Sequence, residues 1–120
     1  MNNTPLVDLQ MVNSLRALEA AAEPGLLREL IDEFLQAAPG RLERLSLLAR
    51  ERNTAALEAE AHALAGSCGA LGLERLRLLC RQAEKAAAAG TVDAHAVEAL
   101  GTVFEQTREQ LLPLREPAGN

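Results

Sequence analysis

Apolar residues recur along most of this chain at alternating steps of three and four, and this spacing restricts its fold more than any other feature. Three of the runs are Leu57, Ala61, Leu64, Cys68, Leu71, then Leu73, Leu76, Cys80, Ala83, Ala87, then Val97, Leu100, Phe104, Thr107, Leu111, Leu114. Such steps place side chains on one face of an α-helix, as in the seam that a bundle helix buries. Leu and Ala dominate a sequence with two Phe and no Trp or Tyr, which favours helices over strands.

These runs, together with the residues that begin and end them, predict five helices. The first helix is capped by Asp8 or Thr4 and ends near Ala21, and the second is a long helix that is kinked at Pro39 and ends near Arg50. The third is capped by Asn53 or Thr54, the fourth ends at Gly90, and the fifth is capped by Asp93. Short connections predict an all-α, antiparallel up-and-down four-helix bundle with an additional N-terminal helix. The 120 residues suit a single domain, 1–120, ordered over about 6–115 with short flexible tails.

The charge and the hydropathy pattern exclude several classes of function. A net charge of −5 without a basic block argues against a nucleic-acid partner. No apolar run approaches the roughly 18 residues that span a bilayer, so we expect no membrane insertion and a cytoplasmic location. Cys68 and Cys80 lie on predicted seams and are expected to be reduced core thiols, with a disulfide between adjacent helices as the alternative.

His62 stands apart from the seam of the third helix. It lies roughly 140° from the seam's centre and should face solvent. Its side of the helix is made of Ala55, Glu58, Ala59, Ala65, Gly66 and Gly69. A solvated helix face normally carries Lys, Glu, Gln and Arg, and a glycine inside a helix costs about 1 kcal/mol relative to alanine. A bare surface around one imidazole therefore indicates a partner that approaches closely.

The same stretch carries a family resemblance. The chain contains the run His62-x-Leu64-x-Gly66-Ser67-x-x-x-Leu71-Gly72-Leu73-x-x-Leu76, followed by Cys80 and Glu84. This run resembles the signature of histidine-containing phosphotransfer (HPt) domains of two-component phosphorelays. The resemblance implies that His62 accepts a phosphoryl group from a receiver-domain aspartate and passes it to another receiver.

The resemblance also implies the partners. They are the receiver domain of a response regulator, a hybrid sensor histidine kinase, or both. The chain offers no acidic cluster for a metal, so Mg²⁺ and the acceptor carboxylate are expected in the partner receiver, and this chain is expected to bind no cofactor of its own. It would be a phosphoryl-group carrier rather than an enzyme.

One position departs from the family. Ala65 stands where members usually have a Lys near the phosphoryl group, and this departure bears on transfer rate and partner choice. Arg77, Arg81 and Lys85 on the fourth helix can replace part of the missing charge, or they form a solvated face paired with nearby Glu. The departure also leaves open a second interpretation, a helical receiver- or kinase-docking module that no longer transfers phosphate.

Two further side chains have expected roles at the histidine. Glu84 lies at the edge of an apolar stripe, and the matching family position often holds a Gln or Glu that faces the histidine. By accepting a hydrogen bond from Nδ1–H it would leave Nε2 of His62 as the nucleophile, although an ordinary surface Glu fits the position too. Ser67 is expected to bond a backbone carbonyl one turn back.

Docking of the partner is expected on apolar residues beside His62. Candidates are Val12, Leu27 and Ile31 on the first two helices, which also suit a core, and Ala59 on the histidine's own helix. His95 is expected to be an exposed bystander, and two isolated histidines predict no metal site. We expect a monomer; the alternative is an oligomer that covers the bare face.

Overall fold

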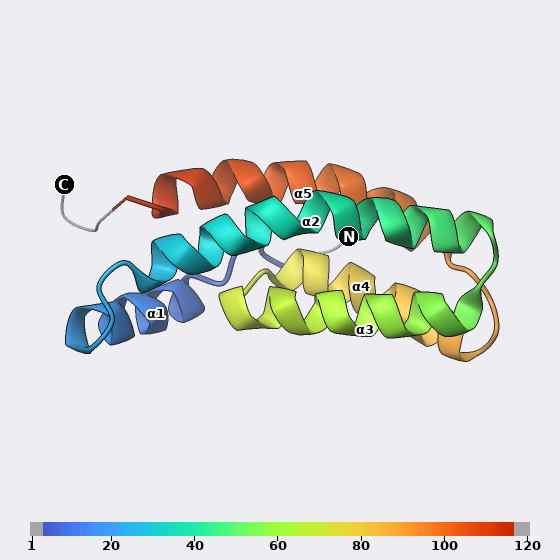
Figure 1. Ribbon diagram of the computed structural model, residues 1–120, viewed down its shortest axis with the longest axis horizontal. Helices are drawn as coiled ribbons and strands as arrows, with labels where there is room; N and C mark the ends of the chain where they lie inside the picture. The colour runs from blue at the N-terminus through green and yellow to red at the C-terminus, as the bar shows by residue number, and fades with distance from the viewer. Residues whose placement is uncertain (1–3, 117–120) are drawn as a thin grey trace.

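Regular structure in the computed structural model is entirely helical over residues 4–116, the part of the chain that the structure describes. The helices are α1 (Leu9–Ala21), α2 (Leu26–Arg50), α3 (Thr54–Leu71), α4 (Glu74–Ala88) and α5 (Ala94–Leu114) (Figure 1). The all-α class expected from the spacing is confirmed. Residues 1–3 and 117–120, where flexible tails are predicted, lie outside the described range.

Four of the helices form the predicted up-and-down bundle. Helices α2 and α4 each contact both α3 and α5, so the four close a ring, and successive helices run in opposite directions (Figure 1). Helix α1 packs on α2 and lies at one end of the bundle, as expected for an additional N-terminal helix. The molecule is elongated, with extents of 47 × 28 × 19 Å.

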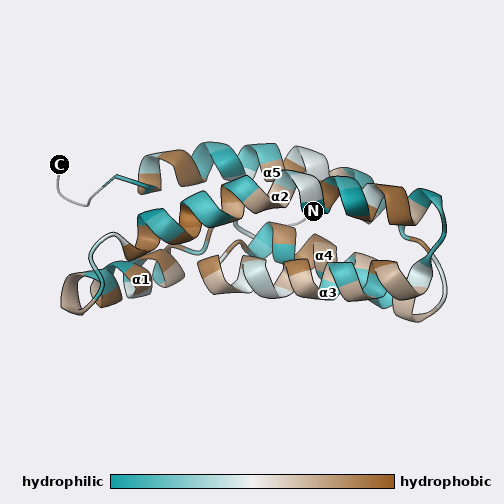
Figure 2. Ribbon diagram, in the orientation of Figure 1, coloured by the Kyte–Doolittle hydropathy of each residue, from teal (hydrophilic) through white to brown (hydrophobic). Residues whose placement is uncertain are grey.

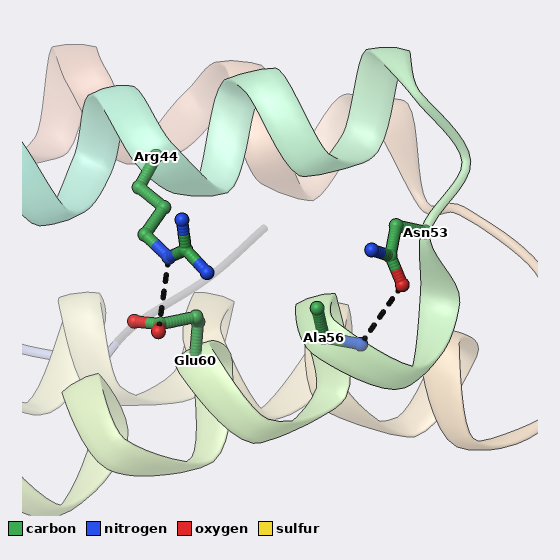
Figure 3. A network of polar contacts seen from close by, with 4 residues as sticks. All are labelled: Arg44, Asn53, Ala56 and Glu60. Carbon is green, nitrogen blue, oxygen red and sulfur yellow. Dashed lines mark hydrogen bonds and ion pairs between the residues drawn. The ribbon is translucent and has the colours of Figure 1, made fainter.

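Polar residues begin three of the helices at the predicted positions. Asp8, Asn53 and Asp93 each accept a hydrogen bond from a backbone N–H in the first turn of the helix that follows. Figure 3 shows the one from Ala56 N–H to Asn53, at 3.2 Å. These bonds satisfy donors that a helix start leaves without an intrahelical partner. Gly72 ends α3 with φ +71°, a left-handed conformation that glycine adopts without steric cost.

Helix α2 continues through Pro39 and Gly40 to Arg50. The proline ring removes one N–H from the helical ladder, which often breaks a helix. Here the apolar stripe keeps its phase across the proline, with Ala38 buried before it and Leu45 and Leu48 buried after it. Burial of that stripe holds the helix together, and the prediction of one long helix is confirmed.

The core is formed by the seam residues of the four bundle helices. The helices are amphipathic, and in Figure 2 hydrophobic (brown) and hydrophilic (teal) segments alternate along α2 and α5. The two aromatic rings, Phe34 and Phe104, meet across the bundle with centroids 6.2 Å apart. Cys68 and Cys80 are fully buried and unbridged, as expected of core thiols. The hydrogen bond between these two thiols, together with burial, raises the pKa of Cys68, so its thiol stays protonated.

The predicted docking residues Val12, Leu27 and Ile31 are core residues, and that prediction is wrong. All three are buried within one hydrophobic cluster. The cause is the packing of α1 on α2 and of α2 on α3 and α5, which covers the apolar stripe of α2 and the inner side of α1. Large aliphatic side chains on such a stripe gain more from burial inside the protein than they would from a partner that is present only at times.

The steps of three residues from Leu9 to Leu18 predict one apolar side for α1, and this prediction is also wrong in part. Of Leu9, Val12, Leu15 and Leu18, only Val12 is buried, while Leu9 is 63% and Leu18 49% exposed. The reason is the constant step of three residues. Each such step turns the side chain by about 60° around a helix of 3.6 residues per turn, so the first and last leucine point in opposite directions.

Candidate functional site

His62 projects from the middle of α3 with 68% of its side chain exposed. The other exposed residues of this helix are all Ala or Gly, namely Ala55, Ala59, Ala63, Gly66 and Ala70. We call these five the small-residue face. The exposure of His62 predicted from the helical period is confirmed, and so is the bare surface around it.

The membership of this face differs from the prediction at three residues. Ala65 is 1% exposed and belongs to the core, while Glu58 and Gly69 are only half-buried. These three lie on the side of α3 that packs against α4, which covers them. The exposed surface is therefore centred on Gly66 and Ala63, on the side of His62 that faces away from α4. The histidine lies at the edge of this surface that is nearest to α4.

Glu84 of α4 fixes the orientation of the imidazole. Its Oε2 lies 2.7 Å from Nδ1 of His62. A carboxylate only accepts hydrogen bonds, so the ring nitrogen that faces it carries the proton. The other oxygen, Oε1, is buried without a hydrogen-bond partner among residues 4–116, which indicates that packing holds the carboxylate in this position. With Nδ1 engaged, Nε2 is the ring nitrogen that a partner can reach.

Three glycines near the site have different structural roles. A Cβ at Gly66 would meet no atom within 4 Å, and one at Gly69 would lie 3.5 Å from Arg77 Cδ, an ordinary contact. At Gly72 the same atom would lie 2.7 Å from Met11 Cβ, and the positive φ would add strain. The fold requires glycine at position 72 and has no steric need for glycine at Gly66 or Gly69.

Ser67 lies on the α2 side of α3, away from the imidazole. Its hydroxyl lies 3.4 Å from the carbonyl oxygen of Ala63, one turn back, as predicted. It also accepts a hydrogen bond of 3.0 Å from Arg41 on α2, which sequence reasoning missed. A second contact, two turns earlier on α3 and about one turn later on α2, joins Arg44 to Glu60 at 3.1 Å (Figure 3). Both contacts pin α3 to α2 and give Ser67 a structural role.

The basic side chains of α4 differ in what they contact. Arg77 forms an ion pair with Glu74 at 2.8 Å. Arg81 and Lys85 are exposed, and neither forms a hydrogen bond or ion pair within residues 4–116. Two cations are therefore available on the helix that also supplies Glu84.

A shallow apolar groove runs between α2 and α3 next to the small-residue face. Its volume is about 290 Å³, and its lining includes Leu30, Phe34, Ala37, Leu64, Ser67 and Ala70. Sequence reasoning missed this groove, because its shape depends on the distance between two helices. Ala70 belongs both to the groove and to the small-residue face, so the two surfaces are continuous.

Neither a metal-binding group nor a membrane-spanning helix occurs in the described part of the chain. No group of three or more His, Cys, Asp or Glu side chains within residues 4–116 is arranged to hold a metal ion. His95 is exposed near the start of α5. None of the five helices is both long enough and apolar enough to span a membrane.

Comparison with known proteins adds a family and two similar structures. The model of the Hpt domain family matches residues 29–111. The structure of histidine-containing phosphotransfer protein B from Pseudomonas aeruginosa shares 23% identity, with a TM-score of 0.82 over 94% of this chain and 96% of that one. A rice protein assigned as a histidine-containing phosphotransfer protein shares 21% identity, with a TM-score of 0.78 over 95% of this chain and 84% of the other. No curated protein matches the sequence.

Proposed function

Because the chain belongs to the Hpt domain family, whose members are phosphocarriers, we propose that His62 carries a phosphoryl group between receiver domains in a two-component phosphorelay. The observation that carries the proposal is the contact of 2.7 Å between Nδ1 of His62 and Glu84. It leaves Nε2 exposed as the nucleophile at the α4 edge of the small-residue face. The whole chain, 1–120, acts as a single domain.

The transfer of the phosphoryl group to His62 needs no proton from solvent. Nε2 of His62 attacks the phosphorus of a receiver's aspartyl phosphate, the new N–P bond forms, and the bond from phosphorus to the aspartate oxygen breaks. The aspartate leaves as a carboxylate. The imidazole keeps its Nδ1 proton and becomes positively charged, and Glu84, held 2.7 Å away, stabilises that charge. Transfer to the next receiver reverses each of these changes.

The metal ion and the carboxylates that bind it come from the partner. Phosphoryl transfer depends on positioning and on neutralising the charge of the phosphoryl oxygens, usually with a divalent metal. The receiver supplies Mg²⁺ and the carboxylates that bind it. This chain supplies an oriented nucleophile on a rigid helix and acts as a carrier, which fits the absence of large side chains around His62.

The docking surface consists of the small-residue face and the α2–α3 groove. The receiver brings its metal and phosphoryl group against His62 over Ala59, Ala63 and Gly66, and an apolar side chain of the receiver enters the groove beside Ala70. This placement replaces the buried residues Val12, Leu27 and Ile31 that the sequence indicated. Since the receiver needs this surface, the free protein is a monomer, which sedimentation can test.

A transfer assay tests the proposal directly. Purified receiver domain labelled on its aspartate is mixed with the protein and Mg²⁺, and the wild type is compared with His62→Gln. Acid-labile, base-stable label on the wild type alone is the expected result. Receivers that bind the protein without transferring label would instead establish a docking module that has lost phosphotransfer, consistent with the alanine at position 65.

A further inference from the structure

The arginines that flank α3 are mostly engaged by other groups. Helix α3 itself contains no Lys or Arg. On the α2 side, Arg41 donates to Ser67 and Arg44 pairs with Glu60. On the α4 side, Arg77 pairs with Glu74. A phosphoryl group on His62 would meet none of these guanidinium groups in a free state.

The register between α3 and α4 singles out Arg81. His62 lies against Glu84, and Gly69 lies against Arg77, so seven residues along α3 correspond to seven residues in the opposite direction along α4. Arg81 falls between the two contacts, at the level of Ala65 and one turn from Glu84. The residues of α3 at this level are small, and they leave room for a long side chain above them.

Charged residues of both signs lie near Arg81 on α4, with Glu84 three residues after it and Arg77 and Lys85 four residues away. Arg81 is exposed and has no hydrogen bond or ion pair among the described residues. It follows Arg77 by four residues and precedes Lys85 by four, and like charges at this spacing destabilise a helix. The arrangement suits an anion that arrives from outside, next to the imidazole.

We propose that Arg81 binds the phosphoryl group carried by His62, a role that rests on the proposed function and adds a phosphate-binding residue to it. A guanidinium presents a planar pair of N–H donors that matches two phosphoryl oxygens. Glu84 and Arg81, both on α4, then contact different parts of the phosphohistidine. Glu84 meets the positive imidazole, and Arg81, one turn away on the same helix, meets the negative phosphoryl oxygens.

The matched control is Lys85, which is equally exposed and also without a partner within residues 4–116. It follows Glu84 directly and points about 100° away from it around the helix, farther round towards solvent than Arg81, which lies about 60° from Glu84 in the same sense. Arg81→Gln and Lys85→Gln each remove one positive charge from α4. Both are expected to fold like the wild type, which circular dichroism checks.

The test measures the ionisation of the phosphoryl group itself. Phosphoramidate serves as donor: Nε2 of His62 attacks its phosphorus, the P–N bond breaks, and ammonia leaves. ³¹P NMR titration then gives the phosphoryl pKa in each variant. A neighbouring cation lowers this pKa, so Arg81→Gln should raise it by about 0.5 pH unit, as expected for one unit charge about 6 Å away in water. Lys85→Gln should give less than half that shift, and Arg81→Lys should fall between wild type and Arg81→Gln.

The outcomes separate the two proposals. An unchanged phosphoryl pKa in Arg81→Gln, or an equal shift in Lys85→Gln, overturns the role of Arg81 while leaving His62 as carrier. A wild type that forms no phosphohistidine, either from phosphoramidate or from a phosphorylated receiver, overturns the carrier function and the role of Arg81 with it.

Discussion

Replacing Gly66 separates what the fold needs from what the receiver needs. A Cβ at this position would meet no atom within 4 Å, and the residue lies inside the regular helix α3. Alanine is favoured over glycine in a helix interior by about 1 kcal/mol, and an exposed methyl group adds little contact. Gly66→Ala should therefore raise the free energy of unfolding by about 0.5–1 kcal/mol. For a domain of this size, the midpoint of thermal unfolding should rise by about 3–5 °C.

Phosphotransfer should respond in the opposite direction when the side chain is large. Gly66→Leu places four carbons on the small-residue face, one turn from His62, and holds the receiver away from Nε2. Because a displacement of about 1 Å can cost roughly 100-fold in rate, we expect transfer from a phosphorylated receiver to slow by at least about tenfold. The matched control is Gly101 on α5, which is also exposed and also has no atom within 4 Å of its Cβ position.

Both variants are measured by thermal unfolding and by rapid-quench transfer from a labelled receiver. Gly101→Ala should stabilise the protein as Gly66→Ala does, and Gly101→Leu should leave the transfer rate unchanged. A destabilised Gly66→Ala would show that the fold itself needs the glycine. Unimpaired transfer by Gly66→Leu would show that no partner comes close to this face, and either result refutes the reasoning.

Three further predictions follow from the same contacts. Glu84→Ala should slow transfer by about 10–100-fold with little change in the free energy of unfolding, whereas Glu84→Gln, which keeps an acceptor for Nδ1–H, should slow transfer less. Rapid-quench transfer assays measure the rates, and urea unfolding measures the stabilities. Ile31→Ala should lower the free energy of unfolding in urea by about 2–5 kcal/mol because the side chain is fully buried, while Leu9→Ala, at a position 63% exposed, should change it by less than about 0.5 kcal/mol. The hydrogen bond from Arg115 lowers the pKa of Asp32 below its ordinary 3.8, so this carboxylate stabilises the fold above that pH and the contribution is lost as pH falls through the lowered value. The urea midpoints of wild type and Asp32→Asn should therefore differ at pH 7 and converge once the pH falls below the lowered pKa of Asp32; a difference that persists in acid would contradict this assignment.

Local patterns in the sequence were enough to predict the helices and their ends. Asp8, Asn53 and Asp93 begin helices because a side-chain oxygen next to a free backbone N–H is a short-range interaction. The exposure of His62 was predicted for a similar reason, since its angle from the buried seam depends only on the helical period. These features need no knowledge of how the helices pack.

Features that depend on packing were predicted less well. Spacing showed that Leu27 and Ile31 share an apolar face, but it cannot show whether that face is covered by another helix or left for a partner. In the same way, Ala65 lies about 60° from His62 on the helix, and only the position of α4 makes it a core residue. The α2–α3 groove and the bond from Arg41 to Ser67 both need the distance between two helices.

The central claim is that Glu84 holds Nδ1 of His62 and leaves Nε2 to take the phosphoryl group. Long-range ¹H–¹⁵N and ³¹P correlation spectra of the phosphorylated, ¹⁵N-labelled protein identify the nitrogen bonded to phosphorus. The expected product is a single phosphohistidine at His62, with the N–P bond at Nε2 and a proton retained on Nδ1. A phosphoryl group on Nδ1, or on His95 or any other residue, would contradict it.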